Sequence, residues 1–202
     1  MSRVLGNQKT NVIWLKLFIS TAMLAYIVYL TWGLFADYLG ANPIEVVTHE
    51  TGEWGLYFLL LSLAVTPLRR HFHLNVLLKF RRFLGLWSFA LLFLHLFVFV
   101  LFDHFFDVQS IIEDIIERPY IAVGFAAFLI MTPLAITSLK KIQRKMGKRW
   151  FILHRSVYLA SILGLIHYWW LVKADIFWPL IFAFILTVLL ADRLYWAYRK
   201  KA

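Results

Sequence analysis

The sequence contains no cysteine among its 202 residues, and charged residues make up only 16% of it. The absence of cysteine excludes disulfides, zinc–thiolate sites, iron–sulfur clusters and the C-x-x-C-H motif that attaches haem covalently. Neither G-x-G-x-x-G nor G-x-x-x-x-G-K-[ST] occurs, so the sequence has no nucleotide-binding fingerprint. The hydrophobic content is 62% and the mean hydropathy is +0.73, which is typical of a protein embedded in a bilayer.

Apolar runs of about 20 residues, the length that crosses a bilayer as a helix, recur along the chain. They cover residues 12–35, 52–68, 83–102, 119–139, 150–172 and 176–195. We therefore predict an all-α integral membrane protein, a six-transmembrane-helix bundle that forms a single domain over residues 1–202. The polar stretch up to Gln8 has no cleavable-signal pattern, so we expect the first span to remain as an anchor.

The net charge of +10 is distributed by loop, and basic and acidic connections alternate. Basic residues precede the first span, join spans two and three and spans four and five, and follow the last span: Arg3, Lys9; Arg69, Arg70, Lys79, Arg81, Arg82; Lys140, Lys141, Arg144, Lys145, Lys148, Arg149; Arg199, Lys200, Lys201. Acidic residues occupy the two other loops: Asp37, Glu45, Glu50, Glu53; Asp103, Asp107, Glu113, Asp114, Glu117. The positive-inside rule predicts that both termini are cytoplasmic. Because topology explains the basic clusters, we expect contact with membrane lipids and no nucleic-acid partner.

Two histidines, His95 and His167, occur inside apolar runs at matching depth. His95 precedes Asp103 by eight residues and His167 precedes Asp175 by eight, and each aspartate lies where its run meets water. Eight residues of helix rise about 12 Å, so both imidazoles are predicted to lie well below the same outer face. An ionisable residue inside a span is a functional-site candidate.

Ligation of haem iron is the chemistry that suits such a pair, since no cysteine is available. A low-spin b-type haem needs two neutral imidazoles about 4 Å apart on opposite sides of the iron. Spans three and five supply one each, His95 and His167. The alternative for either histidine is a hydrogen bond between helices, as polar residues in membrane bundles make. The depth-matched pair favours haem that is bound without covalent attachment.

His154 lies on the same predicted span as His167, thirteen residues nearer the cytoplasmic face. That separation is about 20 Å along a helix, which suits two redox centres stacked across a membrane. Thirteen residues also place the two rings about 140° apart around an ideal helix, so they do not share a face. Three alternatives stay open for His154: pairing with His71 or His73 of the basic loop, contact with a different cofactor, or an interfacial position.

Two arginines are candidate partners for the negative groups of a cofactor. Arg118 is the only Lys or Arg of its acidic loop, where it can pair with a haem propionate, and the alternative is snorkelling to lipid headgroups. Arg155 is costly inside a span and is a candidate for binding a propionate or a phosphate. His49 and His104 are expected in solvated or interfacial positions.

Several segments together resemble one bacterial membrane family. They are Arg81-Arg82-Phe83-Leu84-Gly85-Leu86-Trp87, His95-Leu96, Arg118-Pro119-Tyr120, Gly147-Lys148-Arg149-Trp150, Leu153-His154, Val157-Tyr158-Leu159 and Ile166-His167-Tyr168. Asn42-Pro43, His49 with Thr51-Gly52, and Thr66-Pro67-Leu68 also fit. In their order and spacing, over nearly the whole chain from Val12, these segments resemble the MsrQ (YedZ) family of inner-membrane haem proteins.

The resemblance implies a ferric-reductase-like transmembrane domain related to the membrane core of NADPH oxidases. It implies a multi-pass protein of the bacterial inner membrane with haem b and FMN as cofactors, and His95, His154 and His167 as ligand candidates. Oxidase relatives carry two histidines on the third span and this sequence carries one, so both one and two haems stay open. The implied partner is the periplasmic molybdopterin-dependent methionine-sulfoxide reductase MsrP. The implied electron donor is the quinone pool or a cytoplasmic flavin reductase.

We therefore expect a membrane electron-transfer subunit that supports the repair of methionine sulfoxide in periplasmic proteins. The partner reduces the sulfoxide, and no catalytic residue is assigned to this chain. A stand-alone ferric or quinone reductase is an alternative in the same class. A haem-free assembly factor or transporter subunit is an alternative from another class, and a visible spectrum distinguishes it from the electron conduit.

Overall fold

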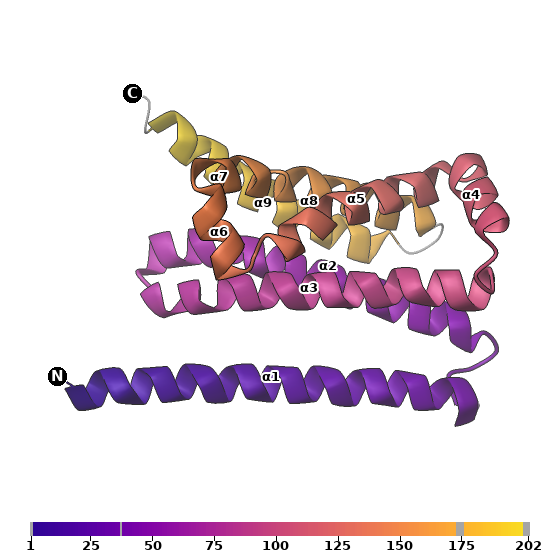
Figure 1. Cartoon of the computed structure of the whole chain (residues 1–202), viewed down its shortest axis with the longest axis horizontal. Helices are drawn as coiled ribbons and strands as arrows, with labels where there is room; N and C mark the ends of the chain where they lie inside the picture. The colour runs from indigo at the N-terminus through magenta and orange to yellow at the C-terminus, as the bar shows by residue number, and fades with distance from the viewer. Residues whose placement is uncertain (1, 37, 173–175, 200–202) are drawn as a thin grey trace. The chain divides into compact units, whose positions relative to one another are not determined.

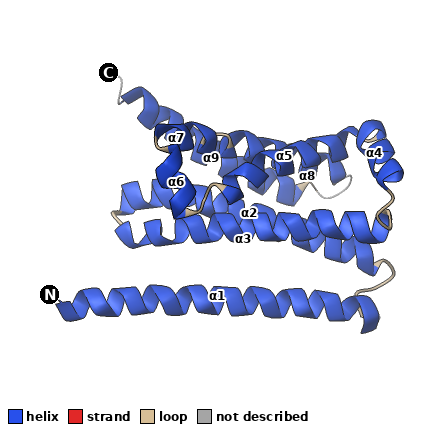
Figure 2. Ribbon diagram, in the orientation of Figure 1, coloured by secondary structure: helices blue, strands red, loops and turns tan. Residues whose placement is uncertain are grey.

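The computed structural model describes residues 2–36, 38–172 and 176–199, with side chains from Thr10 onward. The described chain consists of helices joined by short loops (Figure 2), and it divides into two compact units, residues 1–50 and 51–202. The all-α prediction is thus confirmed over this part of the chain. Some residues of the predicted charge pattern lie outside it: Asp37, Asp175, Lys200, Lys201 and the side chains of Arg3 and Lys9.

The first unit contains α1 (Ser2–Ala36) and the start of α2 (Pro43–Phe72). The local sequence explains why α2 begins where it does. The Asn42 side chain accepts a hydrogen bond from the Glu45 backbone N–H and donates one to the Glu45 carboxylate, which is a reciprocal cap. Pro43 occupies the first helical position, where its missing N–H costs nothing.

The second unit contains the rest of α2 and the remaining elements. These are η1 (Asn75–Leu77), α3 (Leu78–Val98), the π-helical turn η2 (Phe99–Asp103), α4 (Val108–Glu117), α5 (Pro119–Ile136), α6 (Lys140–Met146), α7 (Lys148–His154), α8 (Val157–Leu171) and α9 (Phe177–Arg199). Within this unit α2, α3, α5, α8 and α9 run alongside one another, and α4 and α6 lie at its opposite ends (Figure 1). The most extensive packing joins α5 to α8.

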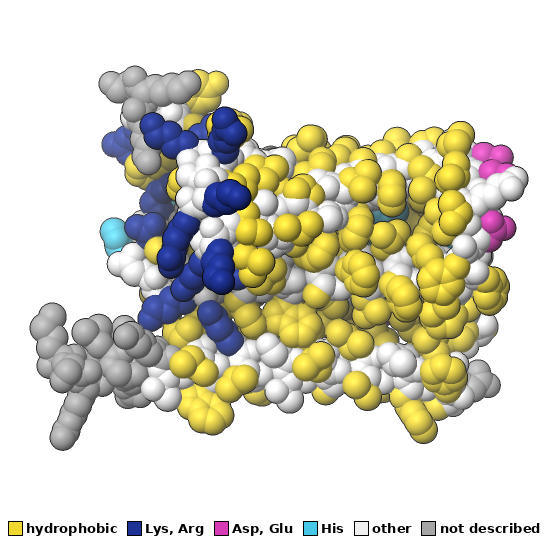
Figure 3. Space-filling view, in the orientation of Figure 1, with side chains coloured by type: hydrophobic (Ala, Val, Ile, Leu, Met, Phe, Trp, Pro, Cys, Tyr) yellow, Lys and Arg dark blue, Asp and Glu magenta, His cyan; other side chains and the backbone are white. Residues whose placement is uncertain are grey.

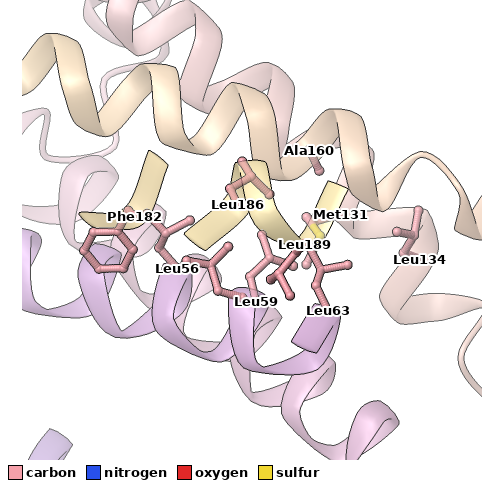
Figure 4. Packing of buried hydrophobic residues seen from close by; sticks show 10 residues of the cluster. Leu56, Leu59, Leu63, Met131, Leu134, Ala160, Phe182, Leu186 and Leu189 are labelled. Atoms are coloured by element: carbon pink, nitrogen blue, oxygen red, sulfur yellow. The ribbon is translucent and has the colours of Figure 1, made fainter. Parts of the chain in front are cut away.

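One leucine-rich face of α2 organises the core of this unit (Figure 4). The buried cluster combines four residues of α2 with residues of α5, α8 and α9: Leu56, Leu59, Leu60, Leu63; Met131, Leu134; Ala160; Phe182, Leu186, Leu189. The α2 residues recur every three or four positions, so they share one helix face. The position of α2 therefore decides where the surrounding helices pack.

Five helical stretches are long and apolar enough to cross a membrane: Thr10–Ala36, Asn75–Asp103, Pro119–Ile136, Lys148–Leu171 and Phe177–Arg199. They overlap five of the six predicted spans. The other predicted span, residues 52–68, lies inside α2, where Glu53, Ser62 and Thr66 interrupt the apolar run. The number of spans and the side of the membrane that each terminus faces therefore stay predictions.

The fifth predicted span contains a break that its apolar pattern does not predict. The prediction that His154 and His167 share one helix is wrong, because α7 ends at His154 and α8 begins at Val157. The Arg155 and Ser156 backbone N–H groups donate to carbonyls only three residues back, as in a 3₁₀ turn. Since a 3₁₀ turn winds the chain more tightly than an α-helix, the azimuth expected for an ideal helix does not apply.

Charged side chains gather at opposite ends of the second unit (Figure 3). On the face shown, Lys and Arg cover the end where α6 and α7 lie, and acidic residues lie at the end that carries α4. At the basic end, Arg193 donates to the Leu63 carbonyl at 2.9 Å and to the Tyr158 hydroxyl, which ties α9 to α2 and α8. Arg70 and Asp192 form an ion pair at 2.8 Å between α2 and α9. The charge separation expected from the sequence is therefore present across this unit.

A small residue allows α2 and α3 to approach closely. A Cβ added at Gly55 would lie 2.8 Å from Leu92 Cδ2, and the buried Ser88 hydroxyl donates to the Gly55 carbonyl at 2.8 Å. Glycine and serine at a membrane-helix interface let two backbones approach and add a hydrogen bond between them. Gly85, on the same helix pair, has more room, since its Cβ would lie 3.5 Å from Ser62 Oγ.

Replacing Gly55 with alanine should therefore lower the free energy of unfolding by about 1–3 kcal/mol, because the new methyl group overpacks the α2–α3 contact. Thermal unfolding followed by circular dichroism in detergent measures the effect. Gly85→Ala is the matched control and should leave the midpoint unchanged or raise it. Equal midpoints for the two variants would contradict the close approach at Gly55.

Candidate functional site

The structure brings the side chains of His95 of α3 and His167 of α8 close together. Their ring centroids lie 6.0 Å apart, and the ring planes cross at 80°. Both helices belong to the second unit, so the pair is formed inside one compact body. The depth match in the sequence is therefore accompanied by lateral proximity, which the sequence alone did not provide.

The hydrogen bonding of His167 determines which of its nitrogens is available. Its Nδ1 lies 2.7 Å from the backbone carbonyl oxygen of Tyr120, in the first turn of α5. A carbonyl only accepts, so Nδ1 carries the proton and donates it, and Nε2 of the neutral ring keeps its lone pair. This is the usual arrangement of a metal-binding histidine, in which the second ring nitrogen is oriented by a backbone oxygen.

Two glycines make room for the two rings. A Cβ at Gly52 of α2 would lie 3.0 Å from His95 Nδ1, and one at Gly124 of α5 would lie 2.7 Å from His167 Nδ1. Each imidazole therefore rests its Nδ1 edge against the backbone of a neighbouring helix. Because the rings and backbones are already in contact, a larger residue at either position would displace the ring.

The geometry of the pair fits the axial ligation of haem iron. A metal–imidazole nitrogen bond is about 2 Å long, so two axial nitrogens lie about 4 Å apart and the ring centres lie farther out on either side. The observed centroid separation of 6.0 Å agrees with that arrangement. Among the described residues, no group of three or more His, Cys, Asp or Glu side chains is placed to hold a metal ion.

His154 is in a different environment. Its Nε2 lies 3.0 Å from Thr137 Oγ1, and its ring stacks on Trp150 with the centroids 3.9 Å apart. The Thr137 hydroxyl donates to the Pro133 carbonyl at 2.6 Å, so it accepts from His154, whose Nε2 then carries the proton. The Trp150 indole N–H donates to the Thr137 carbonyl at 3.0 Å. His154 thus joins α7 to the end of α5.

The proposed loop partners of His154 have other surroundings. His71 Nε2 lies 2.8 Å from an Asp192 carboxylate oxygen, so His71 is part of the ion-pair group between α2 and α9. His73 adopts a positive φ of 56° in the loop after α2, a conformation that few side-chain-bearing residues adopt.

The two candidate arginines both lie outside helix interiors. Arg118 immediately precedes α5, is 53% exposed, and lies 3.3 Å from Asp114. A hydrogen bond with the Tyr120 side chain and then the Asp114 carboxylate raise the pKa of Arg118 above its ordinary value, so its guanidinium stays charged. Arg155 lies in the turn between α7 and α8 with an exposed side chain, inside the candidate span Lys148–Leu171.

Two residues near the acidic end differ from their expected roles. His104 was expected to be solvated or interfacial, but it is 8% exposed, with Nδ1 2.7 Å from Ser110 Oγ and Nε2 3.2 Å from Asp114. Glu53 was expected in an acidic loop, but it lies within α2 and accepts a hydrogen bond of 2.8 Å from the Tyr168 hydroxyl. The positions of His104 and Glu53 are decided by contacts with residues that are distant in the sequence or lie across a turn, so the sequence did not predict them.

Comparisons with known proteins agree with this architecture. The family described as "Ferric reductase like transmembrane component" matches residues 51–165, a segment that contains His95 and His154 and ends two residues before His167. This match and the apolar helices support a multi-pass membrane protein. The matched segment begins at the first residue of the second compact unit.

Three curated relatives carry the same name, "Protein-methionine-sulfoxide reductase heme-binding subunit MsrQ". The chain is 50% identical to the Herminiimonas arsenicoxydans protein over 169 residues, which cover 82% of this chain and 78% of the relative. It is 51% identical to the Rhodospirillum rubrum protein over 164 residues, covering 81% and 79%. It is 41% identical to the Xanthomonas euvesicatoria protein over 197 residues, covering 95% and 90%.

Thr137→Val should destabilise the protein by about 1–3 kcal/mol, because the His154 Nε2–H loses the hydroxyl that accepts its hydrogen bond. Thr137→Ser keeps the hydroxyl and should behave like the unmodified chain. Thermal unfolding in detergent compares the two variants. The assigned hydrogen bond would be refuted by a valine variant as stable as the serine variant.

Proposed function

The chain belongs to the family of MsrQ haem-binding subunits of protein-methionine-sulfoxide reductase, and from this premise we propose that it conducts electrons across the bacterial inner membrane. The acceptor is the periplasmic molybdoenzyme MsrP, which repairs methionine sulfoxide in periplasmic proteins. The donor is the quinone pool or a cytoplasmic flavin reductase. Reduction of the sulfoxide belongs to the partner, and this chain supplies the path through the membrane.

The facing pair of His95 and His167 is the observation that carries the proposal, because it offers two imidazoles at the separation that one haem iron needs. A haem b bound there supplies a one-electron Fe(III)/Fe(II) couple. Reduction of one sulfoxide to a thioether and water consumes two electrons and two protons, so the subunit must deliver two electrons in succession.

The surrounding residues hold the ligands rather than react. The Tyr120 carbonyl keeps the proton of His167 on Nδ1, which leaves Nε2 facing away from α5 as a ligand. Gly52 and Gly124 bring two helix backbones against the rings, so rotation of either ring is restricted. Arg118 precedes the turn that contains Tyr120, and we assign it to a haem propionate through a charge-assisted hydrogen bond.

Fewer residues are assigned to a second haem, and none to FMN. His154 is the candidate ligand of a second haem, and ligation through Nε2 requires release of its bond to Thr137 and transfer of its proton. Arg155, exposed in the adjacent turn, is the candidate partner for a propionate or phosphate at that end. FMN follows from the family resemblance, and we assign no residue to it.

We also propose that the full chain, residues 1–202, forms one six-span domain with both termini in the cytoplasm. The separation of basic and acidic side chains across the second unit supports this orientation, since basic loops are retained on the cytoplasmic side. Electrons then enter at the basic end or from a membrane quinol and leave at the acidic end. A stand-alone ferric or quinone reductase is the alternative with the same cofactor.

Alanine substitutions test the ligand pair. His95→Ala and His167→Ala should each abolish the bis-imidazole haem signal in the Soret and α-band regions. In each variant only one histidine of the pair remains, and one imidazole cannot give a bis-imidazole signal. Spectra and pyridine haemochrome quantification of purified protein measure this, and His49→Ala, an exposed position, is the control. Retention of that signal in either variant would remove the pair from the assignment. The haem content of His154→Ala counts any second site.

The contact of Gly124 with the His167 ring gives a prediction that leaves both histidines in place. Gly124→Ala should reduce haem occupancy or broaden the haem spectrum, because the added methyl group overlaps the His167 ring. Gly164→Ala is the matched control on α8, where the nearest atom to the added Cβ is Leu56 Cδ1 at 4.0 Å. Normal haem spectra in both variants would contradict the close support of the His167 ring.

Reconstitution in vesicles tests the proposed circuit. With an electron donor on the basic side and MsrP on the acidic side, loss of methionine sulfoxide should require this chain, and the His95→Ala variant should not support it. Vesicles with the reverse orientation are the control. Reduction of ferric iron or quinone that is unaffected by MsrP, without electron delivery to MsrP, would favour the stand-alone reductase.

A further inference from the structure

The short helix α4 joins the ends of two candidate spans. The span that contains α3 and η2 ends at Asp103, and the next begins at Pro119, so α4 lies at the level where both reach the membrane boundary. Figure 1 shows α4 crossing this end of the second unit at a large angle to α3. A helix in that place has one side against the bundle and its remaining surface toward lipid or water.

The residues of α4 form three strips along the helix. The inner strip is half-buried: Ser110, Ile111, Asp114 and Ile115. The apolar strip is exposed, by 66%, 50% and 75% for Val108, Ile112 and Ile116. The acidic strip is also exposed: Gln109, Glu113 and Glu117. At 100° per residue, the centres of the two exposed strips lie about 100° apart, and each lies about 130° from the inner strip.

Specific contacts fix the rotation of α4 about its own axis. The Asp107 side chain caps the helix by accepting from the Gln109 N–H at 3.0 Å. His104 holds the inner strip through Ser110 at 2.7 Å and approaches Asp114 at 3.2 Å. Asp114 also lies 3.3 Å from Arg118 at the start of α5. These contacts hold the inner strip on the bundle, so the two exposed strips keep their directions.

We propose that α4 is an interfacial helix, seated at the membrane surface at the acidic end of the second unit, with its apolar strip against lipid and its acidic strip in water. Because the two exposed strips diverge by about 100°, one can rest against lipid while the other faces water. Burial of aliphatic side chains is favourable, which favours placing the apolar strip among lipid chains. The proposal requires a membrane-spanning chain and is independent of haem.

The occupant of the apolar strip is lipid because of where the strip lies and which charges flank it. It occupies the level at which two spans end, and the neighbouring exposed Phe105 and Phe106 extend the apolar surface there. The acidic strip excludes deeper immersion, since carboxylates are costly in the hydrocarbon region. Attraction between basic side chains and anionic lipid does not contribute, because the exposed charges of α4 are acidic, so the seating depends on apolar burial.

The absence of native cysteine allows a direct test. Single cysteines placed across residues 108–117 carry a nitroxide spin label in the full-length protein, reconstituted in nanodiscs of phosphatidylethanolamine and phosphatidylglycerol. Collision with oxygen reports lipid exposure, and collision with a water-soluble nickel chelate reports water exposure. Ile112→Cys and Glu113→Cys are the matched pair, adjacent in sequence and both exposed.

The ratio of oxygen to nickel accessibility should be several-fold higher at 112 than at 113, and should vary with a period of 3.6 residues, with maxima at 108, 112 and 116. High salt should not lower the ratio at 112, since it screens the repulsion between the acidic strip and phosphatidylglycerol. Nickel accessibility at 112 equal to that at 113 would overturn the proposal and would indicate a water-facing strip suited to a protein partner. Protection of 112 from both reagents would also overturn it. Circular dichroism of each labelled variant verifies the fold.

Discussion

The support of two imidazoles by two helix backbones is the constraint on which the site depends. His95 and His167 come from α3 and α8, and the backbones of α2 and α5 lie against their Nδ1 edges at Gly52 and Gly124. The leucine face of α2 and the close packing of α5 on α8 keep these helices in place. Core packing and ligand geometry are thus linked, since a shift of α2 or α5 moves the surface against which a ring rests.

The hydrogen bond from His167 to the Tyr120 carbonyl determines the tautomer of this imidazole. In a low-dielectric interior a neutral imidazole is far less costly than a charged one, and a backbone acceptor at Nδ1 fixes which neutral tautomer is present. The Nε2 lone pair is then available without reorganisation when a metal binds. His154 has the opposite arrangement, because its Nε2–H donates a hydrogen bond to the Thr137 hydroxyl and its ring stacks on Trp150. His167 and His154 both lie in apolar runs, but their hydrogen bonds make different ring nitrogens available to a metal.

The ends of the second unit are held by polar contacts of different kinds. At the basic end, Arg193 and the pair of Arg70 and Asp192 tie α9 to α2 and α8. At the acidic end, His104 and Asp114 fix α4 against the start of α5. Between them the face shown in Figure 3 is mainly apolar, as a bilayer requires. The same charge separation that supports an orientation in the membrane therefore also supplies contacts that close the helix bundle.

The sequence by itself determined the helical class, five of the candidate membrane spans, the alternation of charge and the depth match of His95 and His167, because hydropathy, loop charge and helical rise are properties of neighbouring residues. Tertiary structure alone decided that the two rings meet, that Gly124 and the Tyr120 carbonyl support one of them, and that His104 is buried. It also decided the break after His154, where a tightened turn interrupts an apolar run that reads as continuous. These features depend on the rotation and spacing of helices that are distant in sequence, and periodicity along one helix carries no information about its neighbour.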